Sequence, residues 1–316
     1  MTRVLNRYWL WTLVIAAALI FIFVQSGFDF EYVIPKRLNR LGAIVIGGVC
    51  VAVSSIVFQT IAGNRILTPA VMGYEAVYLL LQSLLTLVLG GHGLIAIGRN
   101  ESFFLSIVFM LAYSWAVHRY FFKDGRRNVY FLLLLGLVLT MLFGTMIQFI
   151  QLKISPGDFG IVQGFIYASF NRAQPEQLAY AAVLLAAISI VLAKTLPSLD
   201  VLALGREQSL SLGLDYKRSV RLYLSIIAAL VAVSTSLIGP TAFMGIFVAN
   251  ITYSMTKSTW HRLTLPTGCA VAVGIFIIAQ LLVEHVFNYT TTVSILVNLV
   301  CGAYFLMLMV RTRGNA

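Results

Sequence analysis

Charged side chains are scarce in this sequence. They make up 10% of the 316 residues, whereas a soluble domain carries about 25%. Only 11 residues are Asp or Glu, 60% are hydrophobic, and the mean hydropathy is +0.92. The apolar residues are spread over the full length, which excludes a water-soluble domain attached to a single anchor. The sequence therefore predicts a protein embedded in a membrane.

Cysteines are few, and nucleotide-binding motifs are lacking. Cys50, Cys269 and Cys301 lie in apolar runs without C-x-x-C spacing, so neither a disulfide framework nor a zinc site is expected. The phosphate-binding pattern G-x-x-x-x-G-K-[ST] does not occur. The longest polar connection, 194–221, is too short for a folded soluble domain. We expect no metal and no directly bound cofactor, and ATP that drives the protein would be hydrolysed by another chain.

Uncharged runs define the expected architecture. A span needs about 20 apolar residues, and the run 222–256 is long enough for two, divided at Gly239-Pro240, where a helix would break. The runs are 8–28, 41–64, 76–98, 102–118, 128–152, 177–193, 222–256, 263–283 and 285–310. The predicted fold class is an all-α polytopic membrane protein with about ten transmembrane helices, which form one domain over residues 1–316.

Basic residues are distributed unevenly between the connections. With an even number of spans both termini share one side, and placing both in the cytoplasm assigns sixteen of the 22 Lys and Arg residues to cytoplasmic segments. The six on the outer side are Lys36, Arg37, Arg40, Arg99, Lys153 and Arg172. This is the positive-inside pattern of membrane proteins. It explains the net charge of +11 without a nucleic-acid partner.

Two connections carry more than a simple turn. Outside, the turn sequence Ser155-Pro156-Gly157-Asp158 precedes the run 159–170, which is apolar but too short to span, so a re-entrant or interfacial helix is expected. Inside, the connection 194–221 repeats leucine at helical spacing beside charged residues, which predicts short cytoplasmic helices with a docking surface. We expect Pro197 to end the preceding span and Gly213 to end a short helix in the left-handed conformation.

Three blocks of sequence resemble one known family. The first comprises R-L-N-R at 37–40, Gly47-Gly48, Gln59, N-R-I-L-T-P at 64–69 and Gly73. The second is L-G-R-E at 204–207 with L-G-L at 212–214, and the third is I-G-P-T-A-F-M-G at 238–245. In this order they resemble the FecCD-type permeases of ABC importers for iron-siderophores and cobalamin, in which R-L-P-R, N-P-L-A-x-P, L-G-E-E, S-L-G-V and A-G-P-I-G-F-V-G recur. Asn39, Arg65-Ile66 and V-A-N at 248–250 depart from that pattern.

The resemblance implies the type II ABC importer permease architecture and three groups of site residues. The segment 196–218 would dock the ATPase, through Leu204, Gly205, Arg206, Glu207, Leu212 and Gly213. A binding protein would dock on Lys36, Arg37 and Arg40 at the outer face. Candidates for the pathway or its gate are Asn64, Pro69, Gly239, Pro240 and Asn250.

The resemblance also implies the partners and the location. It predicts a transport subunit rather than an enzyme, in the cytoplasmic (inner) membrane, that translocates a ferric siderophore. The partners would be a second permease subunit, related but not identical, two cytoplasmic ABC ATPase subunits and an extracytoplasmic siderophore-binding protein. A cobalamin or haem importer permease remains an alternative.

An ion-gradient-driven secondary transporter of a small solute is the alternative from another class. It would need acidic residues within the spans, and Glu75 and Glu284 lie at span ends. We expect Glu284 and His285 to form a solvated pair at the membrane interface.

Overall fold

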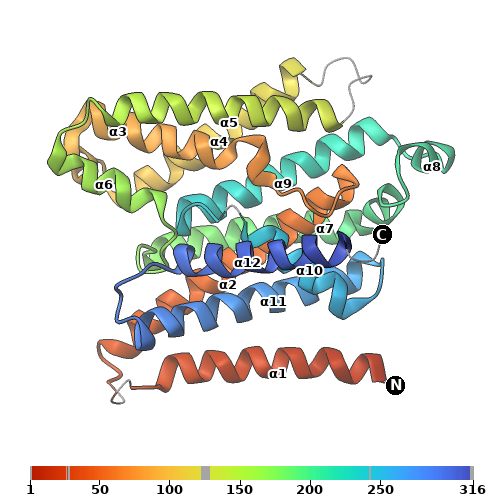
Figure 1. Ribbon diagram of the computed structural model, residues 1–316, viewed down its shortest axis with the longest axis horizontal. Coiled ribbons are helices and arrows are strands. Elements are labelled where there is room, and N and C mark those ends of the chain that lie inside the picture. Colours follow the sequence, from red (N-terminus) through yellow and green to blue (C-terminus); the bar gives the residue numbers. More distant parts are fainter. Residues whose placement is uncertain (1, 26, 28, 122–128, 242, 314–316) are drawn as a thin grey trace.

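The computed structural model describes residues 2–25, 27, 29–121, 129–241 and 243–313. All regular elements in these ranges are helical (Figure 1). The longer helices are α1 (Thr2–Phe23), α2 (Val33–Ala62), α3 (Tyr74–Ile97), α4 (Arg99–Phe121), α5 (Val129–Gln151), α7 (Pro175–Leu202), α9 (Tyr216–Ile238), α10 (Met244–Thr256), α11 (His261–Leu281) and α12 (Val293–Arg313). The shorter elements are the 3₁₀ turn η1 (Pro69–Met72), α6 (Pro156–Ile166), α8 (Arg206–Ser211) and the π-helical turn η2 (Leu282–Val286).

The predicted all-α membrane fold is confirmed. Each uncharged run other than 222–256 overlaps one longer helix, and the run 222–256 forms α9 and α10 with the break at Gly239-Pro240. Within the described residues, six helices are long and apolar enough to cross a membrane, and shorter apolar stretches lie in α1, α3 and α12. The 13 residues of α10 fall short of a full span. The basic residues Lys123, Arg126 and Arg127 of one expected inner connection lie outside the described residues.

Helices α2 and α9 form the centre of the bundle. Most residues of both are buried, whereas few described residues of α5 and α7 are. Small residues permit the close approach: a Cβ on Gly47 would lie 2.6 Å from Ile238 Cδ1 of α9, and one on Gly48 would lie 3.1 Å from Val273 Cγ2 of α11. Glycine at helix contacts is the usual way for membrane helices to pack closely.

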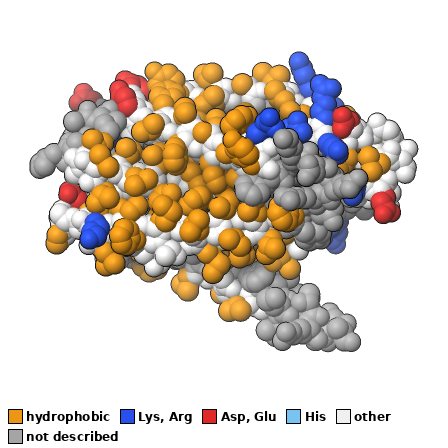
Figure 2. All heavy atoms as spheres, turned by 90° about the horizontal axis from the view of Figure 1, so that it is seen from above, with side chains coloured by type: hydrophobic (Ala, Val, Ile, Leu, Met, Phe, Trp, Pro, Cys, Tyr) orange, Lys and Arg blue, Asp and Glu red, His pale blue; other side chains and the backbone are white. Residues whose placement is uncertain are grey.

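The surface has the polarity of a membrane protein. Apolar side chains cover the middle of the visible face, and Lys, Arg, Asp and Glu gather at the two ends (Figure 2). The start of α1, the end of α12 and α8 all lie at one end of the bundle, and α6 lies at the other (Figure 1). In the structure, therefore, both termini share a side, and the expected docking segment is on that side.

The chain returns into the bundle after α2, where the segment 66–72 packs against α4 and α5. A Cβ on Gly136, in the first half of α5, would lie 2.7 Å from Met72 Cα, and the Tyr113 hydroxyl in α4 donates to Met72 O at 2.8 Å. Residues 66–72 are mostly apolar, so the segment can be buried, and Tyr113 satisfies one of its carbonyls. Irregular backbone at membrane depth is tolerated where protein covers it.

The outer connection also folds back. Helix α6 begins at Pro156, and the Ser155 hydroxyl caps it by accepting from Asp158 N at 3.2 Å. Beyond α6, Ser169 N donates to Ile238 O at the end of α9, at 2.7 Å. The expected short helix is therefore present, and the residues that follow it enter the bundle.

Helix α7 is longer than expected, because Pro197 lies inside it instead of ending it. Proline removes the hydrogen bond to the carbonyl four residues earlier, and both Pro197 and Ala193 are exposed, so solvent can reach that carbonyl. Leu199 and Leu202 are buried against the core and favour continuation of the helix. The polar connection thus begins at Ala203.

Candidate functional site

Helix α8 presents an apolar and charged surface at the end of the bundle that carries both termini (Figure 1). Leu204, Leu210 and Leu212 are 56%, 50% and 64% exposed, and Arg206 and Glu207 are exposed beside them. Of the three leucines at helical spacing in the connection 194–221, Leu202 is buried, Leu214 is half-buried and Leu210 is exposed. Exposed leucines beside charges at the end of a membrane bundle are typical of a surface that another protein covers.

Local hydrogen bonds hold α8 in one orientation. Gly205 precedes the helix with φ 97°, and Gly213 follows it with φ 80°, as predicted for a left-handed helix end. Leu214 N donates to Ser209 O and Gly213 N donates to Leu210 O, both at 3.0 Å, which is the Schellman arrangement. The buried Ser209 hydroxyl bonds Val201 O of α7 at 2.9 Å. The exposed surface of α8 is therefore held against α7.

A buried histidine connects the end of α7 to the core. His261 Nδ1 lies 2.5 Å from Asp200 Oδ1, and its backbone N–H donates to the same oxygen at 3.0 Å. Its Nε2 lies 2.8 Å from Thr60 Oγ1 of α2. Three helices, α2, α7 and α11, meet at this ring. The sequence alone does not indicate this contact, because Asp200, His261 and Thr60 come from segments far apart in the chain.

The basic cluster at the other end of the bundle separates into different environments. Lys36 is exposed, lies over the Tyr32 ring at 3.7 Å from its centroid, and lowers the pKa of that phenol through a hydrogen bond. Arg37 is 5% exposed, and its Nη1 donates to Phe21 O at 3.0 Å and to other carbonyls at the end of α1. Arg40 is partly exposed. Only Lys36 and Arg40 are therefore accessible to a partner.

Glu284 pairs with arginine and not with His285. Its Oε1 lies 3.1 Å from Arg37 Nη2 and its Oε2 lies 3.4 Å from Arg40 Nη1, with the carboxylate side chain 12% exposed. His285 Nδ1 instead contacts Leu281 O at 3.2 Å. The expectation of a solvated Glu284–His285 pair is wrong, because α2 brings two guanidinium groups to the carboxylate. A partly buried carboxylate is costly unless it is paired in this way.

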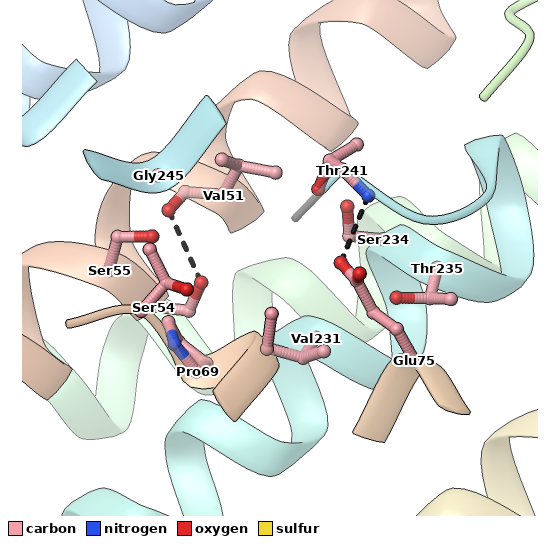
Figure 3. A pocket seen from close by; sticks show the side chains of 12 residues that line it. Val51, Ser54, Ser55, Pro69, Glu75, Val231, Ser234, Thr235, Thr241 and Gly245 are labelled. Carbon is pink, nitrogen blue, oxygen red and sulfur yellow. Dashed lines mark hydrogen bonds between the residues drawn. The ribbon is translucent and has the colours of Figure 1, made fainter. Parts of the chain in front are cut away.

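Two of the predicted gating segments meet at a small polar cavity (Figure 3). The cavity has a volume of about 20 Å³, sufficient for one water molecule. Ser54 and Ser55 of α2 lie on one side, and Glu75 and Ser234 lie on the other (Figure 3). Thr241 N, just after Gly239-Pro240, donates to Glu75 Oε1 at 2.9 Å. Glu75 therefore joins the start of α3 to the turn between α9 and α10.

The candidate gating residues are not all brought together. Pro69 lines the polar cavity, whereas Asn64 accepts from Ile66 N at 2.9 Å in the exposed turn after α2, and Asn250 donates to Ile246 O within α10. Gly239 is confined by its neighbours: a Cβ there would lie 2.8 Å from Arg172 Nη2 and 3.2 Å from Ala168 Cα. Its φ of 100° also requires glycine.

The polar lining of this cavity was missed by sequence reasoning. The signals were present as adjacent hydroxyl residues in otherwise apolar runs, Ser54-Ser55 and Ser234-Thr235-Ser236. The prediction placed Glu75 at the end of a span, and Glu75 does lie in the first turn of α3. The start of α3, however, lies inside the bundle and not at its surface. Only the return of the chain after α2 shows that this acidic residue is internal.

An apolar hollow lies between η1, α5, α10 and α12. It has a volume of about 580 Å³, and its walls include Val71, Met141, Phe247 and Tyr304, with Asn298 and Thr140 among its few polar residues. The adjoining surfaces of α5 and α12 expose large apolar side chains, among them Leu134. This face has the chemistry of a surface that contacts lipid or another membrane helix.

Comparison with known proteins places these features in a family. A model of the FecCD transport family matches residues 6–311. The petrobactin import system permease protein YclO of Bacillus subtilis (strain 168) is 34% identical over 292 residues, which are 92% of this chain and 92% of YclO. A second petrobactin import system permease protein of that organism, YclN, is 23% identical over 291 residues, 89% of this chain and 86% of YclN.

A solved structure shares the fold. It is described as an inward-facing conformation of a metal-chelate type ABC transporter, and it aligns with a TM-score of 0.85 over 97% of this chain and 99% of its own. The sequence identity in that alignment is 18%. The likeness therefore supports the arrangement of helices described above.

Proposed function

Because this chain belongs to the FecCD transport family, we propose that it is the membrane-spanning permease subunit of an ABC importer that carries a ferric siderophore across the cytoplasmic membrane. The observation that carries the proposal is the 34% identity to YclO over nearly the full length of both chains. YclO is named for petrobactin, a siderophore. The family membership does not favour an ion-gradient-driven secondary transporter.

ATP hydrolysis belongs to partner chains in this proposal. The exposed leucines of α8, with Arg206 and Glu207 beside them, supply a rigid surface onto which a cytoplasmic ATPase docks. Two such ATPase subunits would serve two permeases. Both termini of this chain would lie in the cytoplasm, since they share the end of the bundle that carries α8 (Figure 1).

A second permease subunit would cover the face formed by α5, α10 and α12. The apolar hollow of about 580 Å³ on this face would then border the pathway. An apolar lining binds a bulky chelate weakly, and weak binding permits release. YclO and YclN are two different permeases named for the same import system, which favours a related, non-identical partner.

The outer face would receive the siderophore-binding protein. Lys36 and Arg40 are accessible there, and charges at the rim of an interface set encounter rate and register. Arg37 would act through its support of Arg40 and Glu284. Opening of the pathway would involve the segments that hold Asn64, Pro69, Gly239, Pro240 and Asn250. Of these residues Pro69 lines the polar cavity, and Thr241, directly after Gly239-Pro240, lines it as well.

Uptake measurements test the substrate. Cells that lack their own siderophore permeases, supplied with this chain and its partner subunits, should accumulate iron-55 from ferric petrobactin in an ATP-dependent manner. Labelled cobalamin and haem serve as competing cargoes. Accumulation of cobalamin or haem instead of the ferric chelate would contradict the siderophore assignment.

Reversal of one charge on α8 tests the docking surface. Glu207→Lys should reduce uptake and substrate-stimulated ATP hydrolysis about tenfold or more. In the proposed contact Glu207 faces a basic group of the ATPase, and a lysine at this position would repel that group. Glu101→Lys is the control, since Glu101 is an exposed acid at the start of α4, away from α8. Equal activity of the two variants at equal membrane levels would exclude this role for Glu207.

A further inference from the structure

A second large cavity lies between α3, α4, α6 and α9, away from the apolar hollow. Its volume is about 510 Å³, within the range of small-molecule sites, about 300–1,000 Å³. Tyr78, Phe103 and Phe165 supply aromatic walls. The cavity reaches Gly98, at the start of α4, and α6, so it occupies the end of the bundle opposite to α8 (Figure 1).

The charge in this cavity is of one sign. Arg99 and Arg172 line it, and no Asp or Glu is among the described residues that do. Arg172 Nη2 is engaged by Tyr167 O and by Ile238 O, the latter at 3.2 Å, but its buried Nε has no partner among the described residues. Burial lowers the pKa of this guanidinium. The charged group is therefore held in place without an anion beside it.

Uncharged polar groups with free hydrogen-bonding capacity accompany the arginines. Gln82 is 1% exposed, and its Nε2 donates to Ser106 Oγ at 2.9 Å. Ser106 Oγ in turn donates to Ser102 O at 2.7 Å, which fixes the amide orientation and leaves Gln82 Oε1 as an acceptor without a described partner. The Ser236 hydroxyl is likewise unpartnered. Buried polar atoms are nearly always hydrogen-bonded, so Gln82 Oε1 and the Ser236 hydroxyl favour a ligand in the cavity that forms hydrogen bonds with them.

We propose that this cavity binds a phosphate ester that also carries hydroxyl groups, the chemistry of a phosphoglycerol headgroup. The guanidinium groups of Arg99 and Arg172 would donate to the phosphate oxygens. Gln82 Oε1 would accept from a ligand hydroxyl, and Ser236 would donate or accept as required. The aromatic walls would contact the glycerol carbons. The same chemistry occurs in an anionic membrane lipid and in soluble glycerol phosphate.

Binding to the purified, delipidated full-length chain in detergent tests the site. The probes are phosphatidylglycerol, phosphatidylcholine with the same acyl chains, and glycerol 3-phosphate, with bound molecules counted by native mass spectrometry. Phosphatidylglycerol should bind at least about tenfold more tightly than phosphatidylcholine, a difference of about 1.4 kcal/mol. Both lipids carry the phosphate, but only phosphatidylglycerol offers hydroxyl groups to Gln82 and Ser236, and the choline cation of phosphatidylcholine is repelled by Arg99 and Arg172. Displacement by glycerol 3-phosphate at similar concentration would identify a soluble ligand at the same site.

Matched double variants locate the binding. Arg99→Gln with Ser236→Ala should weaken phosphatidylglycerol binding at least about tenfold; neither side chain makes a described hydrogen bond, so the fold should be retained. Lys153→Gln with Ser234→Ala removes one outer cation and one unpartnered hydroxyl that do not line this cavity, and should leave binding unchanged. Equal affinity for the two lipids, or equal binding by the two double variants, would overturn the proposal.

Discussion

At the scale of single residues, Arg37 joins three parts of the outer end of the bundle. It caps carbonyls at the end of α1, lies on α2, and pairs with Glu284 beyond α11. The cap satisfies backbone groups that a helix end leaves unpaired. Arg40, three residues later, contacts the same carboxylate from a more exposed position, with its side chain 23% exposed. Two neighbouring arginines of one motif thus have different physical roles.

We expect Arg37→Gln to lower the free energy of unfolding by about 3 kcal/mol, because it removes a buried ion-pair partner and the cap of α1. Arg40→Gln should lower it by about 1 kcal/mol or less, as for exposed pairs, and Lys36→Gln should have no measurable effect. Denaturant unfolding of the purified protein in detergent measures all three. Similar losses for Arg37→Gln and Arg40→Gln would refute the distinction.

The sequence could identify the basic cluster of Lys36, Arg37 and Arg40, but it could not show which of the three is buried. Basic residues before an apolar run are equally typical of a docking rim and of a helix end in the membrane interface. Which of them is buried depends on where α1 ends and where Glu284 lies, and both are set by contacts between distant segments. Gly213 is the opposite case, because its left-handed conformation follows from local sequence and was predicted.

At the scale of elements, the segment after α2 depends on a glycine of α5. A Cβ on Gly136 would lie 2.7 Å from both Met72 Cα and Val71 O, and backbone atoms yield less readily than the tips of side chains. Gly136→Ala should therefore destabilise the protein by about 1–3 kcal/mol, the usual result of overpacking, and reduce transport.

Gly144→Ala is the control for that prediction, since it lies on the same helix and a Cβ there meets nothing within 4 Å. Alanine also favours helix over glycine, so this control should be neutral or slightly stabilising. Thermal unfolding and uptake are measured for both variants. Equal stability of the two would mean that the segment 66–72 shifts freely to accommodate the added methyl group.

Helix positions were predictable, whereas the path of the chain between them was only partly so. Length and the absence of charge identify spans because hydrocarbon excludes charge. They carry no information on the path of the chain between spans, so they do not predict that the apolar residues 66–72 pack inside the bundle. The prediction that Pro197 ends the helix was wrong because it considered local sequence alone. Proline in a helix has a local free-energy cost, and the burial of Leu199 and Leu202 against the core outweighs that cost.

At the scale of the whole molecule, the orientation in the membrane remains a prediction that labelling tests. In a background without Cys50, Cys269 and Cys301, Ser211→Cys in α8 should react with a membrane-impermeant maleimide only in inverted vesicles. Gly157→Cys in α6 should react only in intact cells from which any outer membrane has been removed. Both positions are exposed in the structure. The reverse pattern would place the termini outside.

The burial of α2 and α9 against each other has a consequence for biosynthesis. The ribosome completes α2 long before it reaches α9, and at about 5–20 residues per second the interval is about 8–30 s. During that time α2 must remain in the bilayer, or beside an insertion factor, with the face that will contact α9 uncovered. The small residues of that face, including Gly47, make few contacts with lipid chains. Misassembly of this importer should therefore begin with α2 pairing to the wrong helix during synthesis.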